Sequence, residues 1–589
     1  MKDFVKTMLA VICGYFVLRI IGFLFLLFFL VGSLAGGKPT LPKNGVLDVD
    51  MSTFVLAEQS KEASAPSIMS MRLDMTPAVG LYDAVGAIRA AADDPGVKYI
   101  LLRADAAMIG MAGAEEFRAA LAGFRDSGKP VVSYVENPSN GSFYLASVSD
   151  KIYMGAHHGG NGQMIGLSAQ LMFLKDILDK VGVNVQLIRH GKYKSAGEMF
   201  IRSSSSPENR EQNQVMVNSA WKALGGTIAG ARGLSEEAFN ALIDGLALNL
   251  PEDYLQAGLV DELVDHEALL GKLCTLAQVE DSRKLGLIPF VDYVTNHVTG
   301  LPGRSNVAVL YADGEIVDGK DYANVAGDRF VQIIDKIRKD KSVKAVVLRV
   351  NSPGGSVAAS EKIRSALDLL QKEKPLVASF GDYAASGGYW ISNGCQKIYA
   401  DATSITGSIG VFSMIPEFSE VTRKLGVGVE TVGSNKHSDM FSLMRPFDSE
   451  ELQCLQLSVE DIYERFVNLV ASSRGLEPAR VDEIAQGRVW LGSDALEIGL
   501  VDEIGTLEDA IAYAASLADF HSSDEYSVVG YPQPLTFVEE FMNSIGQRTE
   551  EPSILSGTPF EALGKAVSGL KAPDPTRVYA RLPYALEIR

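Results

Sequence analysis

The chain has 589 residues, which is long enough for several hydrophobic cores. Hydrophobic residues make up 47% and charged residues 22%, a globular balance that excludes wholesale disorder and fibrous repeats. The formal net charge of 54 − 73 = −19 disfavours binding to nucleic acid through a basic surface. The four cysteines include no CxxC pair, so we expect neither a disulfide framework nor a cysteine-rich zinc site.

The N-terminal residues predict a membrane anchor. Lys2 and Lys6 flank the start of an almost uninterrupted apolar stretch from Met8 to Ala35. A helix that crosses a membrane needs about 20 apolar residues, and the lysines favour a cytoplasmic N-terminus. We therefore expect residues 1–36 to be an uncleaved transmembrane helix, with the rest of the chain outside the cytoplasm. A cleaved signal peptide is the alternative, because Ser33-Leu34-Ala35 has small residues at positions typical of a cleavage site.

After this stretch the sequence repeats itself. The segment from Gly96 to Arg103 resembles the segment from Ser342 to Arg349, 246 positions further on. Gly258 to Glu262 recurs as Gly499 to Glu503, at an offset of 241. Matches in the same order at a nearly constant offset indicate two homologous units. We expect domains at 46–280 and 300–525, a linker at 281–300 and a C-terminal arm at 526–589.

Within each unit, predicted strands alternate with predicted helices. This order is typical of an α/β domain with a mainly parallel sheet, whose ligand sites lie beyond the carboxyl ends of the strands. In the second unit the pattern predicts strands at 307–311, 345–350 and 376–380 and helices around 330–337 and 363–370.

Two glycine-bearing turns follow predicted strands of the second unit. The turn from Asn351 to Ser356 holds the pair Gly354-Gly355 directly before a helix, where free backbone amides can bind an oxyanion. The turn from Gly381 to Tyr389 places Ser386 among small residues, as in turns that expose a nucleophilic serine. Each motif alone is also compatible with an ordinary packed turn.

A serine nucleophile needs a base. None of the seven histidines lies in a motif typical of hydrolases, so lysine is the other candidate. Lys194, in the segment Lys192-Tyr193-Lys194-Ser195-Ala196, follows a predicted strand of the first unit. Burial there would lower its pKa enough for it to act as a base near neutral pH. Most lysines are solvated, so this motif alone leaves a surface role open.

Together, these residues resemble the signal peptide peptidase A (protease IV) family of serine proteases, in its long, two-domain form. The resemblance covers nearly the whole chain, and its most specific segments are Gly381 to Trp390 and Gly487 to Glu503. It implies an α/β fold with two tandem crotonase-like domains related to the proteolytic subunit of Clp protease. It also implies a Ser/Lys dyad, with the serine from the second domain and the lysine from the first.

By motif, the resemblance implies that Ser386 is the nucleophile and Lys194 the general base. Ser408, in Thr406-Gly407-Ser408-Ile409-Gly410, corresponds to the hydroxyl that orients the lysine. The family mechanism needs neither a metal nor another cofactor. The oxyanion donors implied by the resemblance are the backbone amides around Gly354, Gly355 and Gly387.

The repeat gives an independent check on this assignment. Shifting Ser386 back by 246 positions gives Asn140, and shifting Lys194 forward by 244 gives Ser438. Each unit therefore lacks one half of the dyad, which predicts a site between the domains. Lys436 keeps an alternative open, in which the second domain alone would hold a complete site.

The resemblance implies acyl-enzyme hydrolysis of apolar extended peptides, above all cleaved signal peptides. It implies a homo-tetramer anchored in the bacterial inner membrane by one helix, with its catalytic part on the periplasmic side. One alternative is a catalytically inactive membrane-anchored scaffold of the same fold, against which the intact serine and lysine motifs argue. Another is an acyl-CoA hydratase or isomerase, which would also use glycine-rich amides as an oxyanion hole. The expected extracytoplasmic location argues against that enzyme.

Overall fold

The computed structural model describes most of the chain. The predicted anchor at 1–36 and the predicted arm at 526–589 lie mostly outside the described residues. Among the residues that are described, no helix combines the length and the apolar character needed to cross a membrane. The described ranges are 14–15, 17–19, 21–22, 39–42, 44–60, 76–158, 164–297, 304–533 and 578–582.

The first lobe is built on a six-stranded sheet with the strand order β8-β6-β5-β4-β1-β9. All neighbouring strands in it are parallel. Its strands are β1 (Gly45–Asp50), β4 (Val97–Arg103), β5 (Val131–Val135), β6 (Lys151–Gly155), β8 (Glu262–Val264) and β9 (Leu287–Pro289), and β2 (Val55–Ala57) and β3 (Ala78–Gly80) form a separate pair. Its helices are α2 (Leu81–Asp93), α3 (Met111–Asp126), α4 (Asn140–Ala146), α8 (Glu236–Asp244), α9 (Pro251–Gln256), α10 (His266–Ala277) and α11 (Phe290–His297).

Both faces of this sheet are covered, because successive side chains of a strand point to opposite sides. Along β4, Ile100 and Leu102 pack with α2 and α3, whereas Tyr99 and Leu101 pack with α10. The predicted linker, 281–300, contains β9, which pairs with β1, and α11, which packs on the first lobe's core.

The second lobe repeats this plan around a sheet with the order β19-β17-β15-β13-β10-β21, and β16 and β20 extend it beside β15. Here α12 and α13 cover one face and α19 the other. Its strands are β10 (Asn306–Asp313), β13 (Val343–Ser352), β15 (Leu376–Ala385), β16 (Ile398–Ala400), β17 (Ile405–Gly407), β19 (Val489–Leu491), β20 (Glu503–Ile504) and β21 (Ser527–Tyr531). Its helices are α12 (Gly327–Lys339), α13 (Val357–Gln371), α14 (Gly387–Ser392), α15 (Ser419–Lys424), α16 (Ser449–Arg474), α17 (Pro478–Ile484), α18 (Gly492–Glu497) and α19 (Leu507–Leu517).

The prediction of α/β units with mainly parallel sheets is confirmed by this arrangement. Strand β10 is buried along almost its whole length, as expected for a parallel strand covered on both sides. In α12, the predicted spacing holds, since Phe330, Ile334 and Ile337 are buried.

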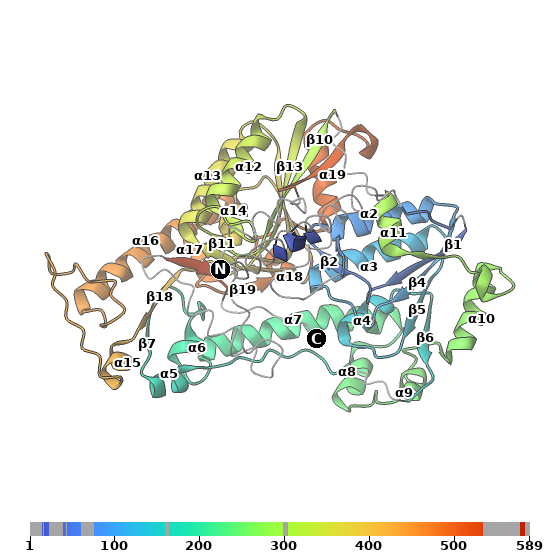
Figure 1. Cartoon of the computed structure of the whole chain (residues 1–589), viewed down its shortest axis with the longest axis horizontal. Helices are drawn as coiled ribbons and strands as arrows, with labels where there is room; N and C mark the ends of the chain where they lie inside the picture. The colour runs from blue at the N-terminus through green and yellow to red at the C-terminus, as the bar shows by residue number, and fades with distance from the viewer. Residues whose placement is uncertain are drawn as a thin grey trace, which may run out of the picture.

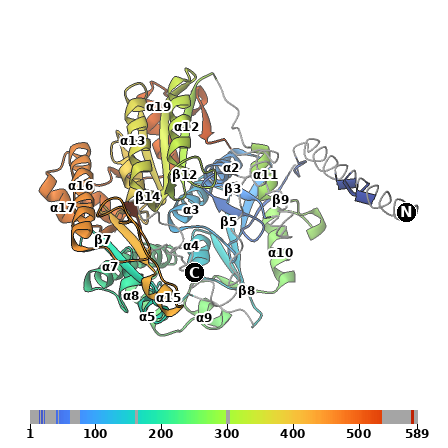
Figure 2. The same ribbon diagram turned by 60° about the vertical axis from the view of Figure 1, so that its left-hand side comes forward.

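A third sheet joins the two lobes, which lie side by side in Figure 1. It has the order β12-β11-β14-β22-β18-β7, and β7 from the first repeat pairs antiparallel with β18 from the second over six residue pairs. Its strands are β7 (Asn184–Arg189), β11 (Ile316–Val317), β12 (Val325–Ala326), β14 (Gly354–Ser356), β18 (Phe412–Glu417) and β22 (Tyr579–Arg581). The part of the chain between β6 and α7 therefore crosses to the second lobe. It contains α5 (Lys175–Val181), β7 and α6 (Glu198–Ile201), and Figure 2 shows α5 close to α15 of the second lobe.

The long helix α7 (Pro207–Ala231) packs against α4 of the first lobe and β19 of the second. In Figure 1 it lies below the second lobe and reaches α4 of the first. This helix and the shared sheet fix how the lobes sit against one another.

Arg349 on β13 is the charged centre of the contact between the lobes. It is 1% exposed, and its Nε and Nη2 lie 2.7 Å from Glu58 and from Glu116 of the first lobe. Its Nη1 donates to the Ser379 hydroxyl and to the Phe380 carbonyl, both at 2.9 Å. One guanidinium thus contacts two carboxylates of the first lobe, and it is also anchored in the sheet of the second.

We predict that Arg349→Leu strongly destabilises the protein, because it leaves Glu58 and Glu116 buried without a cation. The expected loss is about 3–5 kcal/mol, the usual result of removing one partner of a buried ion pair. Chemical unfolding of both proteins measures it. Arg283→Leu is the control, since Arg283 is 90% exposed in its pair with Asp281. Equal unfolding midpoints for the two variants would contradict this role of Arg349.

Candidate active site

Ser386 lies at the turn where β15 ends and α14 begins. Its φ of 57° and ψ of −111° are rare for a residue with a side chain, so the turn is strained. The backbone N–H of Ser386 donates to the Gly407 carbonyl at 2.8 Å, and its side chain is fully buried. A Cβ on Gly387 would lie 2.8 Å from the Ser360 Oγ, so only glycine fits after the serine. The small residues of the motif therefore make this turn possible.

Lys194 reaches the serine from the other repeat. It follows β7, whose pairing with β18 carries it into the second lobe. Its Nζ lies 2.9 Å from the Ser386 Oγ, 3.0 Å from the Ser408 Oγ and 3.2 Å from the Ser408 carbonyl. The structure thus brings together the three side chains that the sequence motifs singled out.

The lysine is fully buried, and burial lowers its pKa from 10.5 to about 7. Desolvation is the cause, because removing an ammonium group from water penalises its charged form. A neutral amine can accept the Ser386 hydroxyl proton, and Ser408 holds the amine in place. The geometry and the pKa are those of a serine nucleophile paired with a general base.

Two glycines close the pocket around the lysine stem. A Cβ on Gly487 would lie 2.6 Å from the Lys194 Cβ, and a Cβ on Gly410 would lie 3.3 Å from its Cδ. The φ of Gly487 is also positive, at 77°. Gly410 stands in the motif around Ser408, but Gly487 was not identified as part of the site. Its only sequence signal is its place at the start of the segment from Gly487 to Leu491.

Polar contacts from Arg189 and from α7 hold the loop that carries Lys194. Arg189 donates to the Lys194 carbonyl at 2.6 Å and pairs with the buried Glu198 at 3.1 Å. Gln212 on α7 donates to the Tyr193 carbonyl at 3.2 Å. These contacts fix the backbone of the loop and leave the amine of the lysine to the two serines.

The predicted oxyanion loop lies beside the nucleophile. Gly354 and Gly355 have φ values of 96° and 158°, and a Cβ on Gly354 would lie 2.6 Å from the Gly387 amide nitrogen. A Cβ on Gly387 would in turn lie 3.1 Å from the Gly355 nitrogen. The backbones of all three glycines therefore meet next to Ser386, where side chains would not fit.

A strand from the C-terminal part of the chain occupies the groove along this loop. In β22, Ala580 is paired antiparallel with Gly355, and Arg581 with Gly354. Leu582 donates its N–H to the Pro353 carbonyl at 2.8 Å and packs against Ala385, next to the nucleophile. This strand could not be predicted, because the apolar residues of the predicted arm follow no regular spacing.

Asp382, four residues before the nucleophile, contacts the first lobe. Its carboxylate accepts a 3.0 Å hydrogen bond from the Ala112 N–H in the first turn of α3, and Gly110 leaves room for it. Burial raises the pKa of this carboxyl to about 6. The strand that ends in Ser386 is therefore attached directly to a helix of the other lobe.

The first repeat's counterpart of the nucleophile has a structural role. Asn140 is buried, and its side chain donates to the Gly166 carbonyl at 2.9 Å and accepts from the Gly166 N–H at 3.3 Å. The alternative base, Lys436, lies on the surface, where it pairs with Glu450 at 2.6 Å. That ion pair raises the pKa of Lys436, so neither its place nor its charge suits a base for Ser386.

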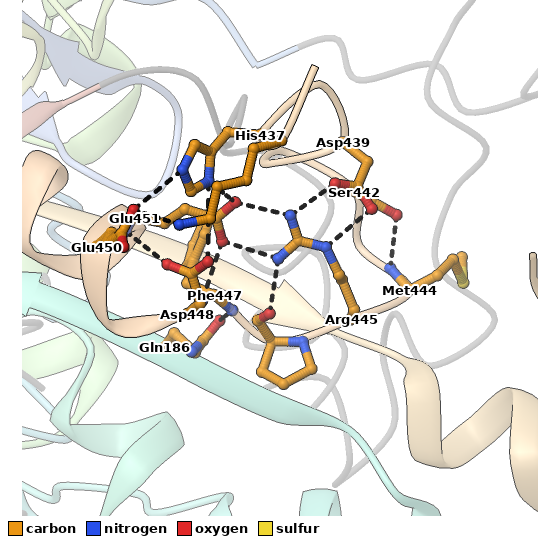
Figure 3. Close-up of polar contacts among 12 residues, drawn as sticks. Gln186, His437, Asp439, Ser442, Met444, Arg445, Phe447, Asp448, Glu450 and Glu451 are labelled. Carbon is orange, nitrogen blue, oxygen red and sulfur yellow. Dashed lines mark hydrogen bonds and ion pairs between the residues drawn. The ribbon is translucent and has the colours of Figure 1, made fainter. Parts of the chain in front are cut away.

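One group among the described residues has the spacing of metal ligands. His437, Asp448 and Glu451 offer atoms within 4.8 Å of one another near the start of α16. Figure 3 shows that Arg445 already occupies this cluster. Its guanidinium donates to both Glu451 oxygens, at 2.7 and 2.8 Å, and also to Asp439. Because Arg445 already neutralises the Glu451 carboxylate, these residues are better suited to hold the loop before α16 in place than to bind a cation.

Comparisons with known proteins agree with the repeat. A model of peptidase family S49 matches residues 123–280 and 368–521. The chain is 35% identical over 525 residues to Protease 4 of Haemophilus influenzae, covering 85% of this chain and 83% of that protein. It is 36% identical over 504 residues to Protease 4 of Salmonella typhi, covering 82% and 80%.

A plant protein and a solved structure are also similar. The chain is 31% identical over 465 residues to the chloroplastic serine protease SPPA of Arabidopsis thaliana, covering 77% of this chain and 68% of that protein. A mutant ClpP1 from Listeria monocytogenes shares 13% identity over 34% of this chain and 94% of that one, with a TM-score of 0.24. That score is too low to support an argument about the fold.

Burial of Lys194 predicts a pH-dependent gain in stability for Lys194→Met. The unfolded state binds more protons than the folded state between pH 7 and pH 10.5, so wild-type stability rises across that window. The variant should therefore melt at least about 2–4 °C higher below pH 7, and the difference should narrow towards pH 10. Lys192→Met, at an exposed neighbour, should show no such trend. Parallel pH profiles for all three proteins would mean that Lys194 is not buried.

Proposed function

The chain belongs to peptidase family S49, and from this premise we propose that it is a serine endopeptidase with Ser386 and Lys194 as its catalytic dyad. The observation that carries the proposal is the 2.9 Å contact between the Lys194 Nζ and the Ser386 Oγ. The burial of both groups supports it, because burial supplies the neutral amine that a base requires.

In the proposed mechanism, neutral Lys194 takes the hydroxyl proton as the Ser386 Oγ attacks a peptide carbonyl. Backbone amides around Gly354 and Gly387 stabilise the oxyanion. The protonated lysine then gives its proton to the leaving amine, which departs and leaves an acyl-enzyme. Lys194 next deprotonates a water that attacks the ester, and the proton returns to Ser386 as the acid product leaves.

We propose that substrates are extended peptides that lie antiparallel to β14, as β22 does. Two features support this. The antiparallel ladder between β14 and β22 supports the binding of an extended chain along β14 by backbone pairing. The side chains of Ala580 and Leu582 are buried beside the dyad, so the groove takes small and apolar residues at alternate positions.

Cleaved signal peptides fit this description, and we propose them as substrates on the basis of the family resemblance and their apolar character. The apolar stretch from Met8 to Ala35 supports a single-pass anchor in the bacterial inner membrane, with the catalytic lobes on the periplasmic side. The homo-tetramer is a proposal that rests on the resemblance alone.

The proposal predicts hydrolysis of an apolar fluorogenic peptide by the detergent-solubilised full chain. Because Lys194 must be neutral, kcat/KM should rise with pH through an apparent pKa of about 7. Ser386→Ala and Lys194→Met should each lower kcat by roughly 10³-fold or more, as losses within a catalytic unit do.

Lys436→Met and Lys192→Met are the matched controls, and both should keep wild-type rates. Activity that survives Lys194→Met but not Ser386→Ala would refute the assigned base. A wild-type protein that cleaves no peptide at any pH, and whose serine does not react with a fluorophosphonate, would favour the inactive scaffold instead.

A further inference from the structure

A groove with a volume of about 470 Å³ has no role in the proposed chemistry. One wall is the segment 167–173, another is the N-terminal part of α7, and the serine run from Ser203 to Ser205 borders it. We call it the side groove.

The wall formed by residues 167–173 has the character of an unpaired strand. The segment belongs to no sheet, and its backbone makes no hydrogen bond within the described part of the chain. Its side chains alternate with the period of a strand. Leu167, Ala169, Leu171 and Phe173 are partly buried and line the groove, whereas the residues between them are exposed. Such an edge is a template for pairing with another extended chain.

The opposite wall offers polar groups without partners. Arg210 on α7 is exposed, and its guanidinium makes no hydrogen bond or ion pair within the described residues. Asn213, one turn further on, is 6% exposed. Its amide nitrogen donates to the carbonyl and side chain of Asn209, but its Oδ1 has no partner. A buried acceptor left unpaired is unfavourable unless a ligand supplies a donor.

One residue of the side groove belongs to the hydrophobic cluster next to Ser386. Leu167 lines the groove and also packs in the cluster that contains Ala385 and Leu582. The side groove therefore borders the cluster that packs around Leu582, at the end of the strand along β14.

We propose that the side groove extends the peptide-binding site and that Arg210 binds a carboxylate of the bound peptide. The ligand is an apolar extended peptide whose backbone pairs along residues 167–173 and donates an N–H to Asn213. The carboxylate is either the C-terminus of the peptide or the side chain of an aspartate or glutamate. This inference rests on the proposed function, because it gives the same site a further stretch of substrate.

Binding to full-length Ser386→Ala protein tests the inference without any need for hydrolysis. Three fluorescent peptides share one apolar sequence: one ends in a free carboxylate, one in an amide, and one in an amide with a glutamate near its end. We expect fluorescence anisotropy to show roughly threefold to tenfold tighter binding of the free acid than of the plain amide. The glutamate peptide tells whether a side-chain carboxylate can replace the terminal one.

Arg210→Gln in the Ser386→Ala background should abolish the preference for the carboxylate. Lys222→Gln, which removes an exposed cation from the same helix away from the groove, should leave it unchanged. Equal binding of the acid and the amide would overturn the inference, and so would a preference for the acid that survives Arg210→Gln. The side groove would then bind another part of this chain or a second copy of it. If the wild type cleaves no peptide but the preference for the carboxylate persists, the proposed dyad is refuted while the proposed binding of a carboxylate by Arg210 is supported.

Discussion

Burial of one lysine amine beside a serine from the other repeat is the constraint on which the rest of this structure depends. A cation in an apolar pocket is unfavourable, and among the residues that the structure describes no carboxylate is placed to neutralise Lys194. The amine therefore loses its proton near neutral pH, which makes it able to act as a base. Its neighbours serve this purpose, since Ser408 fixes the amine and Gly410 and Gly487 close the space around the stem.

The two halves of the dyad lie in different repeats, so their alignment depends on how the lobes are joined. The pairing of β7 with β18 brings the lysine across, and α7 braces both lobes. Arg349 ties the second sheet to Glu58 and Glu116 of the first lobe. Asp382 attaches the strand of the nucleophile to α3. These contacts tie the two repeats together near Ser386 and Lys194.

Much of this could be predicted from local patterns. Apolar runs located β10, β13 and β15, and the glycine-bearing turn indicated Ser386, because strands and tight glycine turns leave short-range signals. The roles of Lys194 and Ser408 came from the resemblance to a known family, and the structure places both beside Ser386. The pairing of β7 with β18 and of β22 with β14 could not be predicted, since contacts between distant segments leave no period in the sequence. The contacts of Arg349 with Glu58 and Glu116 could not be predicted for the same reason, because these residues are far apart in the sequence. The same holds for the contact of Asp382 with Ala112.

The most direct test of the account is a measurement of the Lys194 pKa in the folded protein. NMR titration of isotope-labelled lysine side chains can follow it, with the signal assigned by its absence from Lys194→Met. The account predicts a titration midpoint of about 7. A midpoint near the ordinary lysine value of 10.5 would contradict it, because the amine would then be charged at neutral pH and could not accept the proton of Ser386.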